Sequence, residues 1–374
     1  MTVSLRVVLD QVVSPVDADL AAASRELGRA LVTTAPSGCA VEAIVPAAGP
    51  DVAGALEAAV PGLVDITRLR LPRRELAAAW QLGAASGGAG GLIHAPTLMA
   101  PLVKHDRVHN HDQTVVTVWD LDPWECADEM SRTSVAWHRA MLKRAAKHAD
   151  AIVVPTHAAA ARLSELGSFG DRIRVISGAP TEDFRVPSDE VGRRRELGIP
   201  EGCILLSGSA TVSARLADAF AAIAAHRTDL PVVVIDAPEG GEPAIVQQAV
   251  DAGIAESRLH VRGVLDAWDR GAVLGGTVVF IAPSMRTCFP WRVVEAMRAG
   301  VPVVAAGSDM HREVVVDGGL LADPGDADAL ADAVGEALGS GAAVERLAVL
   351  AGDRGRAFSW AGAAERVWQL HADL

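Results

Sequence analysis

The chain contains little cysteine. Its 374 residues include four, and these lie far apart without a CxxC pair or a regular spacing: Cys39, Cys126, Cys203 and Cys288. Disulfide-rich secreted proteins and cysteine-based zinc sites place their cysteines in regular, closely spaced patterns. We therefore expect four free thiols in a reducing compartment.

Long apolar runs are also missing. No apolar stretch reaches the about 18 residues that a membrane-spanning helix requires. The opening residues, MTVSLRVVLD, lack the basic region and the following apolar run of a signal peptide. The sequence therefore predicts a cytoplasmic protein and leaves open a peripheral contact with the inner face of a membrane.

Blocks of basic residues are absent apart from the short RRR at 193–195, and the net charge is −13. Proteins that bind DNA or RNA hold the phosphate backbone with clustered Lys and Arg side chains. An acidic chain without such clusters is not expected to bind nucleic acid.

The composition that remains is that of a packed protein. Half of the residues are hydrophobic, and the 22% that are charged are spread along the chain, as in ordinary globular domains. A chain of 374 residues exceeds what one hydrophobic core normally serves. Two domains are therefore expected.

Short β-branched runs alternate with Ala-rich amphipathic runs, which is the pattern of parallel sheets covered by helices. One series of predicted strands lies at 5–10, 40–46, 64–69, 91–96, 114–120, 151–155 and 173–178, and a second at 204–209, 231–236, 259–263, 278–283 and 301–306. Helices are predicted between the strands, among them 17–32, 74–84, 132–148 and 157–166. The polar stretch 188–203 separates the two series. The sequence thus predicts an α/β protein with two Rossmann-like domains, in which ligands bind beyond the carboxyl ends of the strands.

Seven phrases of the sequence carry a family resemblance. They are HAPTLMAPL (94–102), VVTVWDLDPW (115–124), RAAKHADAIVVPTHAAAARL (144–163), RVISGAPTEDF (174–184), APSMRTCFPWRVVEAMRAGVPVVAA (282–306), HREVVVDGGLLADPGDADALADAV (311–334) and FSW (358–360). In these phrases and their order, the chain resembles the GT-B retaining glycosyltransferases of family four over nearly its whole length.

The resemblance implies two domains with parallel sheets that face each other across a cleft. Residues 1–185 would form the acceptor-side domain and residues 186–360 the nucleotide-sugar-binding domain, with a last helix at 361–374 packing back onto the first. It also implies a nucleotide sugar as substrate and no metal or other cofactor.

The family carries two glutamates separated by seven residues on the donor side. Glu295, placed by its sequence in the first turn of a helix, matches the second, which binds the ribose of the nucleotide. An ionised carboxylate can accept two hydroxyl hydrogen bonds at once. The alternative is an acidic residue that stabilises the positive end of its helix. Thr287 stands in place of the first glutamate, at a catalytic position, and of the following Gly-Phe-Gly only Phe289 is kept.

Other donor-side candidates lie in loops of the second half. An arginine fixed beside the diphosphate would stabilise the charge on the departing phosphate, whereas the simpler interpretation is a solvated side chain. The donor-binding candidates besides Glu295 and Phe289 are Gly208, Ser209, Arg215, Arg286, Arg292 and Glu313.

Acceptor-side candidates lie in the first half. Asp120 follows a buried strand, where it would contact an acceptor hydroxyl as a catalytic residue or cap the next turn. Trp119 replaces a histidine of the family and could stack on a sugar ring. His109 and His111 are predicted to lie in a surface loop that faces the cleft. A zinc site there would need a further ligand, and no metal site is expected.

The leading hypothesis is a retaining hexosyltransferase that acts on a glycolipid, polysaccharide or small-molecule acceptor. The alternative is a catalytically impaired relative that serves as a partner or binding module of an active glycosyltransferase, because Thr287, Trp119 and a missing diphosphate lysine depart from the family pattern. A third hypothesis is a donor sugar or cyclitol with a different hydroxyl pattern, to which Thr287 and Cys288 are adapted.

Overall fold

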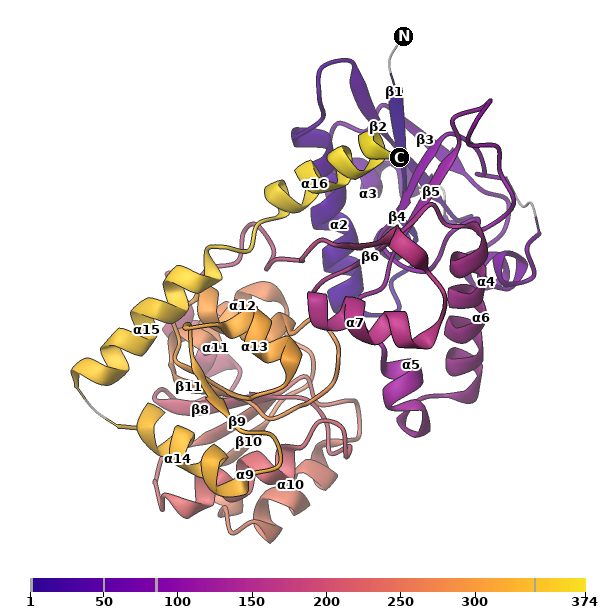
Figure 1. Ribbon diagram of the computed structural model, residues 1–374. Helices are drawn as coiled ribbons and strands as arrows, with labels where there is room; N and C mark the ends of the chain where they lie inside the picture. The colour runs from indigo at the N-terminus through magenta and orange to yellow at the C-terminus, as the bar shows by residue number, and fades with distance from the viewer. Residues whose placement is uncertain (1–2, 50, 85–86, 340) are drawn as a thin grey trace. The chain divides into compact units, whose positions relative to one another are not determined.

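The computed structural model describes residues 3–49, 51–84, 87–339 and 341–374. The chain forms two compact units (Figure 1). Unit 1 comprises Met1–Glu182, Thr287–Phe289 and Ser359–Leu374, and unit 2 comprises Asp183–Arg286 and Pro290–Phe358. The chain therefore enters unit 1 three times.

Unit 1 contains a seven-stranded parallel sheet in the order β3-β2-β1-β4-β5-β6-β7. Its strands are β1 (Val3–Val8), β2 (Cys39–Val45), β3 (Asp65–Arg68), β4 (Leu92–Ala95), β5 (Gln113–Thr117), β6 (Ala151–Val154) and β7 (Ile173–Val175). Every residue of β5 and β6 is buried, as expected for central strands with helices on both faces. Each strand overlaps one predicted from the sequence, and the parallel sheet is confirmed.

Helices connect these strands. They are α1 (Asp10–Val13), α2 (Ala18–Thr33), α3 (Val52–Ala59), α4 (Arg73–Gln81), α5 (Asp122–Glu125), α6 (Arg132–His148) and α7 (His157–Leu166). Side-chain caps fix several of their starts: Asp17 accepts from Leu20 N, Ser131 from Ser134 N and Thr156 from Ala159 N. These caps set where each connecting loop at the carboxyl edge of the sheet ends.

The last helix, α16 (Trp360–Asp373), packs on α2 in unit 1 (Figure 1). Trp368 Nε1 donates to Leu31 O at 3.1 Å, and His371 Nδ1 lies 2.9 Å from Gln113 Oε1. His371 also meets the ring of the buried His94 edge-on at 5.6 Å between centroids. The end of the chain is therefore part of the core of unit 1.

Unit 2 contains a six-stranded parallel sheet in the order β10-β9-β8-β11-β12-β13. Its strands are β8 (Cys203–Ser207), β9 (Val232–Ile235), β10 (Leu259–Val261), β11 (Thr277–Ala282), β12 (Val303–Ala306) and β13 (Leu320–Ala322). Its helices are α8 (Glu190–Glu196), α9 (Leu216–Ala225), α10 (Glu242–Asp251), α11 (Ala267–Gly275), α12 (Trp291–Arg298), α13 (Asp309–Val315), α14 (Ala327–Ala337) and α15 (Ala342–Gly355). The sequence did not predict β13, which is short and follows two glycines.

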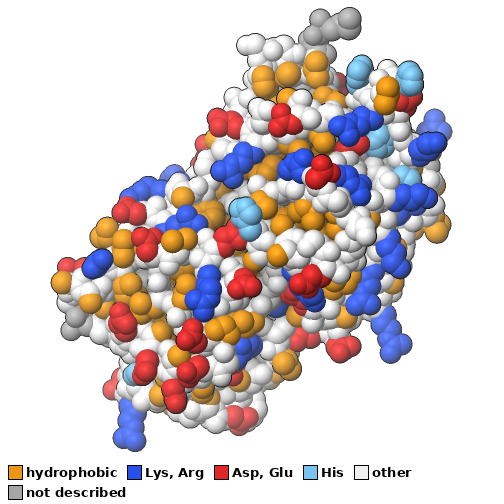
Figure 2. All heavy atoms as spheres, in the orientation of Figure 1, with side chains coloured by type: hydrophobic (Ala, Val, Ile, Leu, Met, Phe, Trp, Pro, Cys, Tyr) orange, Lys and Arg blue, Asp and Glu red, His pale blue; other side chains and the backbone are white. Residues whose placement is uncertain are grey.

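On the face of the molecule that Figure 2 shows, acidic and basic side chains are both present, with hydrophobic side chains among them. Among the described residues, no helix combines the length and the apolar character that crossing a bilayer requires.

Candidate functional site

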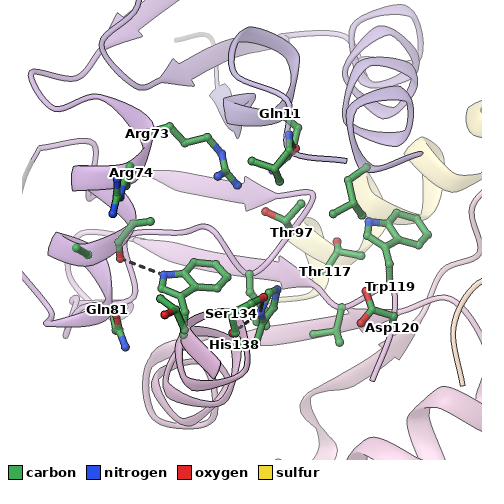
Figure 3. Close-up of a pocket in the computed structure, with 18 of the residues that line it drawn as sticks. Gln11, Arg73, Arg74, Gln81, Thr97, Thr117, Trp119, Asp120, Ser134 and His138 are labelled. Carbon is green, nitrogen blue, oxygen red and sulfur yellow. Dashed lines mark hydrogen bonds between the residues drawn. The ribbon is translucent and has the colours of Figure 1, made fainter. Parts of the chain in front are cut away.

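A cavity of about 570 Å³ opens at the carboxyl edge of the unit 1 sheet (Figure 3). Its lining comes from the residues that follow β1, β4 and β5 and from helices α4 and α6. Parallel strands bring their carboxyl ends to one edge, and ligands of such folds bind there. This cavity is therefore the candidate acceptor site of unit 1.

Several polar groups of the cavity already have partners. Arg73 Nε donates to Asp10 Oδ2 at 2.8 Å, and Gln11 Nε2 donates to the same oxygen at 3.1 Å. Gln11 Oε1 accepts from Val16 N. Burial raises the pKa of Asp10, although the charge of Arg73 opposes that rise. The pair fixes Arg73 at the wall and offsets its charge.

Thr117 and Arg74 also line the cavity, and neither has such a partner among the described residues. Thr117, the last residue of β5, is 2% exposed, and its Oγ1 has no hydrogen-bond partner among the described residues. Arg74, in the first turn of α4, is exposed and forms no ion pair with a carboxylate among them. Buried hydroxyl groups are seldom left unpaired. Sequence analysis missed both residues, although each lies at the end or start of a correctly predicted element.

Trp119 and Asp120 also line this cavity. Trp119 is 6% exposed, donates from Nε1 to Pro96 O at 2.8 Å, and meets Phe289 and Trp360 edge-on. Most of its ring is thus packed against protein. Asp120 Oδ1 accepts from Asp122 N at 3.2 Å, so it caps the next turn. Its side chain also faces the cavity (Figure 3). A contact of Asp120 with an acceptor hydroxyl therefore stays a prediction.

The segment Thr287–Phe289 belongs to unit 1 through backbone pairing. Cys288 forms an antiparallel bridge with Asp120, flanked by Leu121 N to Thr287 O at 3.2 Å and Phe289 N to Trp119 O at 3.0 Å. Thr287 N donates to Glu125 Oε2 at 2.8 Å. Pro290 next to it has no N–H to donate. The N–H groups of Thr287 and Phe289 are therefore used within the protein.

Phe289 itself is 2% exposed. Its ring packs against Trp119, with 6.0 Å between the ring centroids. Its predicted donor-side role remains a prediction, and in this structure its side chain is a packing residue of unit 1.

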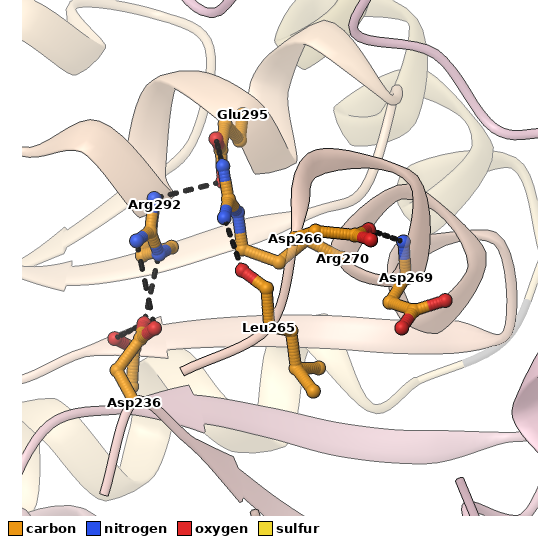
Figure 4. Close-up of polar contacts among 8 residues, drawn as sticks. Asp236, Leu265, Asp266, Asp269, Arg270, Arg292 and Glu295 are labelled. Carbon is orange, nitrogen blue, oxygen red and sulfur yellow. Dashed lines mark hydrogen bonds and ion pairs between the residues drawn. The ribbon is translucent and has the colours of Figure 1, made fainter. Parts of the chain in front are cut away.

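At the carboxyl edge of the unit 2 sheet, four charged side chains form an ionic network (Figure 4): Asp236, Arg270, Arg292 and Glu295. Arg270 donates to both oxygens of Glu295, from Nε at 2.9 Å and from Nη2 at 2.7 Å. Arg292 Nη1 donates to Glu295 Oε2 at 3.1 Å, and Arg292 Nε to Asp236 Oδ2 at 2.8 Å. Two carboxylates face two guanidinium groups, so the network is neutral overall.

Asp236 follows β9 and has φ of 61°, a left-handed conformation that costs an ordinary residue free energy. Ser207 Oγ, at the end of β8, donates to its Oδ2 at 2.6 Å. Burial alone would raise the pKa of Asp236, but the charge of Arg292 and the hydrogen bonds from Arg292 and Ser207 outweigh burial and lower it. The carboxylate therefore stays ionised.

The sequence-based placement of Glu295 in a first helical turn is wrong. Helix α12 begins at Trp291, after Pro290, and its first turn contains no acidic residue. Glu295 lies in the second turn and is 3% exposed, so the helix end does not account for its charge. Its carboxylate accepts three hydrogen bonds from Arg270 and Arg292. Because a carboxylate has about four acceptor positions, the described residues leave one of them unused.

The other donor-side candidates lie in loops and helix starts of unit 2. Gly208 has φ of 135°, where only glycine is unstrained, and its N donates to Ile235 O. Ser209 Oγ lies 3.0 Å from Thr211 Oγ1. Arg215 caps α9 and donates from Nε to Asp218 Oδ2 at 2.7 Å. Arg286 N and Nε lie 3.4 Å from Ser284 Oγ.

Glu313 lies in α13 and is partly buried. Its backbone carbonyl accepts from Arg354 Nη2 at 3.0 Å. Gly208 and Ser209 directly follow β8, at the same sheet edge as Ser207 and Asp236 of the ionic network.

The prediction that His109 and His111 face an acceptor is wrong. Their loop returns to the amino end of β5, which starts at Gln113, and its Asp112 Oδ1 accepts from Gly91 N just before β4. The loop thus lies at the sheet edge opposite the cavity. His109 pairs instead with Asp106, 3.0 Å away. Within residues 3–49, 51–84, 87–339 and 341–374, no three His, Cys, Asp or Glu side chains form a group that could hold a metal ion.

Comparisons with known proteins identify the family. Residues 20–179 match the model of the "Glycosyl transferase 4-like domain", and residues 209–340 match that of "Glycosyl transferases group 1". The two matches follow each other in the chain and together cover more than half of it.

Individual relatives are more distant. The O-antigen chain mannosyltransferase B of Escherichia coli is 25% identical over 280 residues, which are 72% of this chain and 69% of that protein. The D-inositol 3-phosphate glycosyltransferase of Acidothermus cellulolyticus is 32% identical over 220 residues, 53% of this chain and 47% of that one. The phosphatidyl-myo-inositol mannosyltransferase of Mycobacterium leprae is 30% identical over 161 residues, 42% and 41%. The chain thus spans about half the length of the last two relatives.

Solved structures share the fold. Sucrose-phosphate synthase from Thermosynechococcus elongatus superimposes with a TM-score of 0.71 at 20% identity, covering 99% of this chain and 98% of that one. Anabaena Alr3699/HepE in complex with UDP and glucose gives a TM-score of 0.70 at 18% identity over the whole of both chains. The two parallel sheets and these neighbours confirm the predicted GT-B architecture, and with both family models matched in order, the chain belongs to the group 1 glycosyltransferases.

Proposed function

We propose that the protein transfers a hexose from a nucleotide sugar to an acceptor that binds in the cavity of unit 1, with retention of anomeric configuration. The observation that carries the proposal is Glu295: two arginines fix its buried carboxylate at the carboxyl edge of the sheet and leave one acceptor position. A ribose hydroxyl would donate to that position. The names of relatives that are mannosyltransferases, and of neighbours that contain UDP-glucose, support a nucleotide-sugar donor.

The other donor-side residues take roles that follow from their charge. Departure of the nucleoside diphosphate leaves negative charge on phosphate oxygens, and a fixed guanidinium stabilises it. Arg215 and Arg286 are proposed for this role, with Gly208 and Ser209 lining the approach after β8. The reaction is proposed to use no metal, as the family resemblance implies.

Thermal-shift measurements with UDP-, GDP- and ADP-sugars, and with the free nucleotides as controls, test this function in buffer containing EDTA. A ligand at a hundred times its Kd stabilises the folded protein by about 2.7 kcal/mol. We expect one sugar nucleotide to stabilise the protein more than its own nucleotide does, and chromatography to detect its slow hydrolysis. Stabilisation without hydrolysis or transfer to any acceptor would contradict an enzyme.

A second candidate function is that of a catalytically impaired partner of an active glycosyltransferase. The backbone pairing of Thr287–Phe289 favours it, because N–H groups that could approach a donor sugar donate to Glu125 and Trp119 instead. This candidate predicts no thermal shift with any of the nucleotides or sugar nucleotides, and copurification with an active glycosyltransferase.

A further inference from the structure

The cavity of unit 1 has the dimensions of a small-molecule site. Its volume is about 570 Å³, within the range of about 300 to 1,000 Å³ typical of such sites. All of its lining belongs to unit 1, so its shape follows from that unit alone.

Most of its wall is apolar. Trp124 and Trp137 lie on it together with aliphatic side chains from α2 and from the loop after β4, Leu20 and Leu98. Trp137 Nε1 already donates to Ala77 O at 3.2 Å, so its indole offers the cavity mainly its apolar surface. Such a wall binds an apolar chain by removing it from water.

Hydroxyl groups of Thr97, Thr117, Thr133 and Ser134 interrupt this wall. Among them, Thr117 Oγ1 is buried and has no hydrogen-bond partner in the part of the chain that the structure describes, and its side chain points into the cavity (Figure 3). An unpaired buried hydroxyl costs free energy that a ligand hydroxyl could recover by hydrogen bonding. The site therefore favours a ligand with a hydroxyl group close to its apolar part.

The charge of the cavity is positive on one side. On the side of α4, away from Asp120 (Figure 3), Arg73 is offset by Asp10, whereas the exposed Arg74 forms no ion pair with a carboxylate of the described residues. Both arginines lie in the first turn of α4, where the helix dipole already disfavours cations. An anionic ligand group would neutralise the charge of Arg74 and would also interact favourably with the amino end of the helix. Because the protein has a net charge of −13, a generally basic surface does not explain two adjacent arginines at this cavity.

His138 does not supply a second free cation. Its Nδ1 lies 2.8 Å from Ser134 O. Burial lowers the pKa of His138, and the charge of Arg73 lowers it further against the opposing hydrogen bond to Ser134. Its ring is therefore mainly neutral at pH 7.

From the apolar wall, the unpaired hydroxyl and the unpaired arginine, we propose that this cavity binds an anionic, hydroxyl-bearing amphiphile as the glycosyl acceptor. Its anionic group pairs with Arg74, its hydroxyl with Thr117, and its apolar chain lies along Trp124 and Trp137. The role as acceptor rests on the proposed glycosyltransferase function, whereas the binding itself does not.

Binding to the cavity is tested without any nucleotide sugar. A negative result would therefore overturn the proposed ligand without deciding whether the protein is a glycosyltransferase. Octanoyl-glycerol phosphate, below its critical micelle concentration, carries all three features. Glycerol phosphate lacks the chain, and octanoyl glycerol lacks the phosphate. Quenching of tryptophan fluorescence reports occupancy, because Trp119, Trp124 and Trp137 line the cavity. We expect saturable binding of octanoyl-glycerol phosphate, and binding at least tenfold weaker for the other two.

Arg74→Gln should weaken that binding about tenfold, the loss of one charge-assisted hydrogen bond. Arg70→Gln removes the same charge from an exposed residue outside the cavity and should change the Kd less than twofold. Equal effects of the two variants would overturn the proposal. Glycerol phosphate binding as tightly as octanoyl-glycerol phosphate would also overturn it, because the ligand would then be a free phosphorylated polyol.

Thr117→Val separates ligand binding from folding. The variant loses no hydrogen bond within the protein, so its Tm should not fall, while binding of octanoyl-glycerol phosphate should weaken severalfold. Unchanged binding in Thr117→Val would contradict the contact between this hydroxyl and the ligand.

Discussion

Glu295 shows at the scale of single residues what a sequence can and cannot predict. Its position near the carboxyl edge of the unit 2 sheet followed from the order of strands and helices. Its partner Arg270 could not be predicted, because that residue lies 25 positions earlier on α11 and only the packing of α11 brings the two together. Thr117 and Arg74 were missed for a similar reason: neither carries a motif, and their lack of partners appears only in three dimensions.

Removing the carboxylate of Glu295 should destabilise unit 2. Glu295→Ala leaves Arg270, whose side chain is 7% exposed, without its carboxylate partner. Breaking a buried ion pair in this way costs about 3 to 5 kcal/mol. Urea unfolding measures the loss, and Glu336→Ala, at an exposed glutamate, serves as the control with a change within about 0.5 kcal/mol. A Glu295→Ala protein as stable as the control would mean that the network does not hold in solution.

Helices and strands, at the next scale, were predicted well where burial sets the pattern. All twelve predicted strands are found, whereas β13, Leu320–Ala322, was missed because a strand of three residues is too short to show a period. The start of α12 was misplaced, since Pro290 delays it. The loop that bears His109 and His111 was assigned to the wrong edge, because nothing in its residues shows where it turns back toward β5.

Helix α16 should become less stable at acidic pH. Burial lowers the pKa of His371 to about 4, against the opposing effect of Asp150. Burial, and repulsion from His371 whenever that ring is protonated, lower the pKa of His94 well below its usual value. Both rings are neutral in the fold, whereas both take up protons near pH 6.5 when unfolded. Their contribution to stability is therefore complete above pH 6.5 and is lost as the pH falls from 6.5 toward 4.

Thermal unfolding and hydrogen exchange of α16 at pH 7.5, 6 and 5 measure this effect. Each histidine contributes a slope of at most about 1.4 kcal/mol per pH unit. His371→Gln should reduce the slope, and His157→Gln, at an exposed histidine, should leave it unchanged. A slope equal in all three proteins would rule out the buried pair as its source.

At the scale of the whole molecule, the sequence predicted two domains from length and from the two series of strands, and each unit indeed has its own hydrophobic core. The sequence could not predict that Thr287–Phe289 pairs with unit 1, because that pairing depends on contacts with Asp120 and Trp119, far away in the chain. The alternation of strands and helices follows from residues that are close in the sequence, whereas the return of the chain to unit 1 depends on contacts between residues that are far apart in it.

The two cores should unfold separately. Removing 359–374 uncovers α2 and deletes the contacts of Trp368 and His371, so it should lower only the calorimetric transition of unit 1. Phe220→Ala, at a buried residue of unit 2, should lower only the other transition, by about 3 to 5 kcal/mol. One cooperative transition that both changes shift equally would contradict independent cores.

The position of α16 also fixes an order of events during synthesis. The strands of unit 1 leave the ribosome before unit 2 does, yet the helix that covers α2 emerges only after unit 2. Unit 2 is complete in sequence before that helix is released. Unit 1 is therefore begun before unit 2 but completed after it, and until then the α2 face that receives Trp368 is open to chaperones.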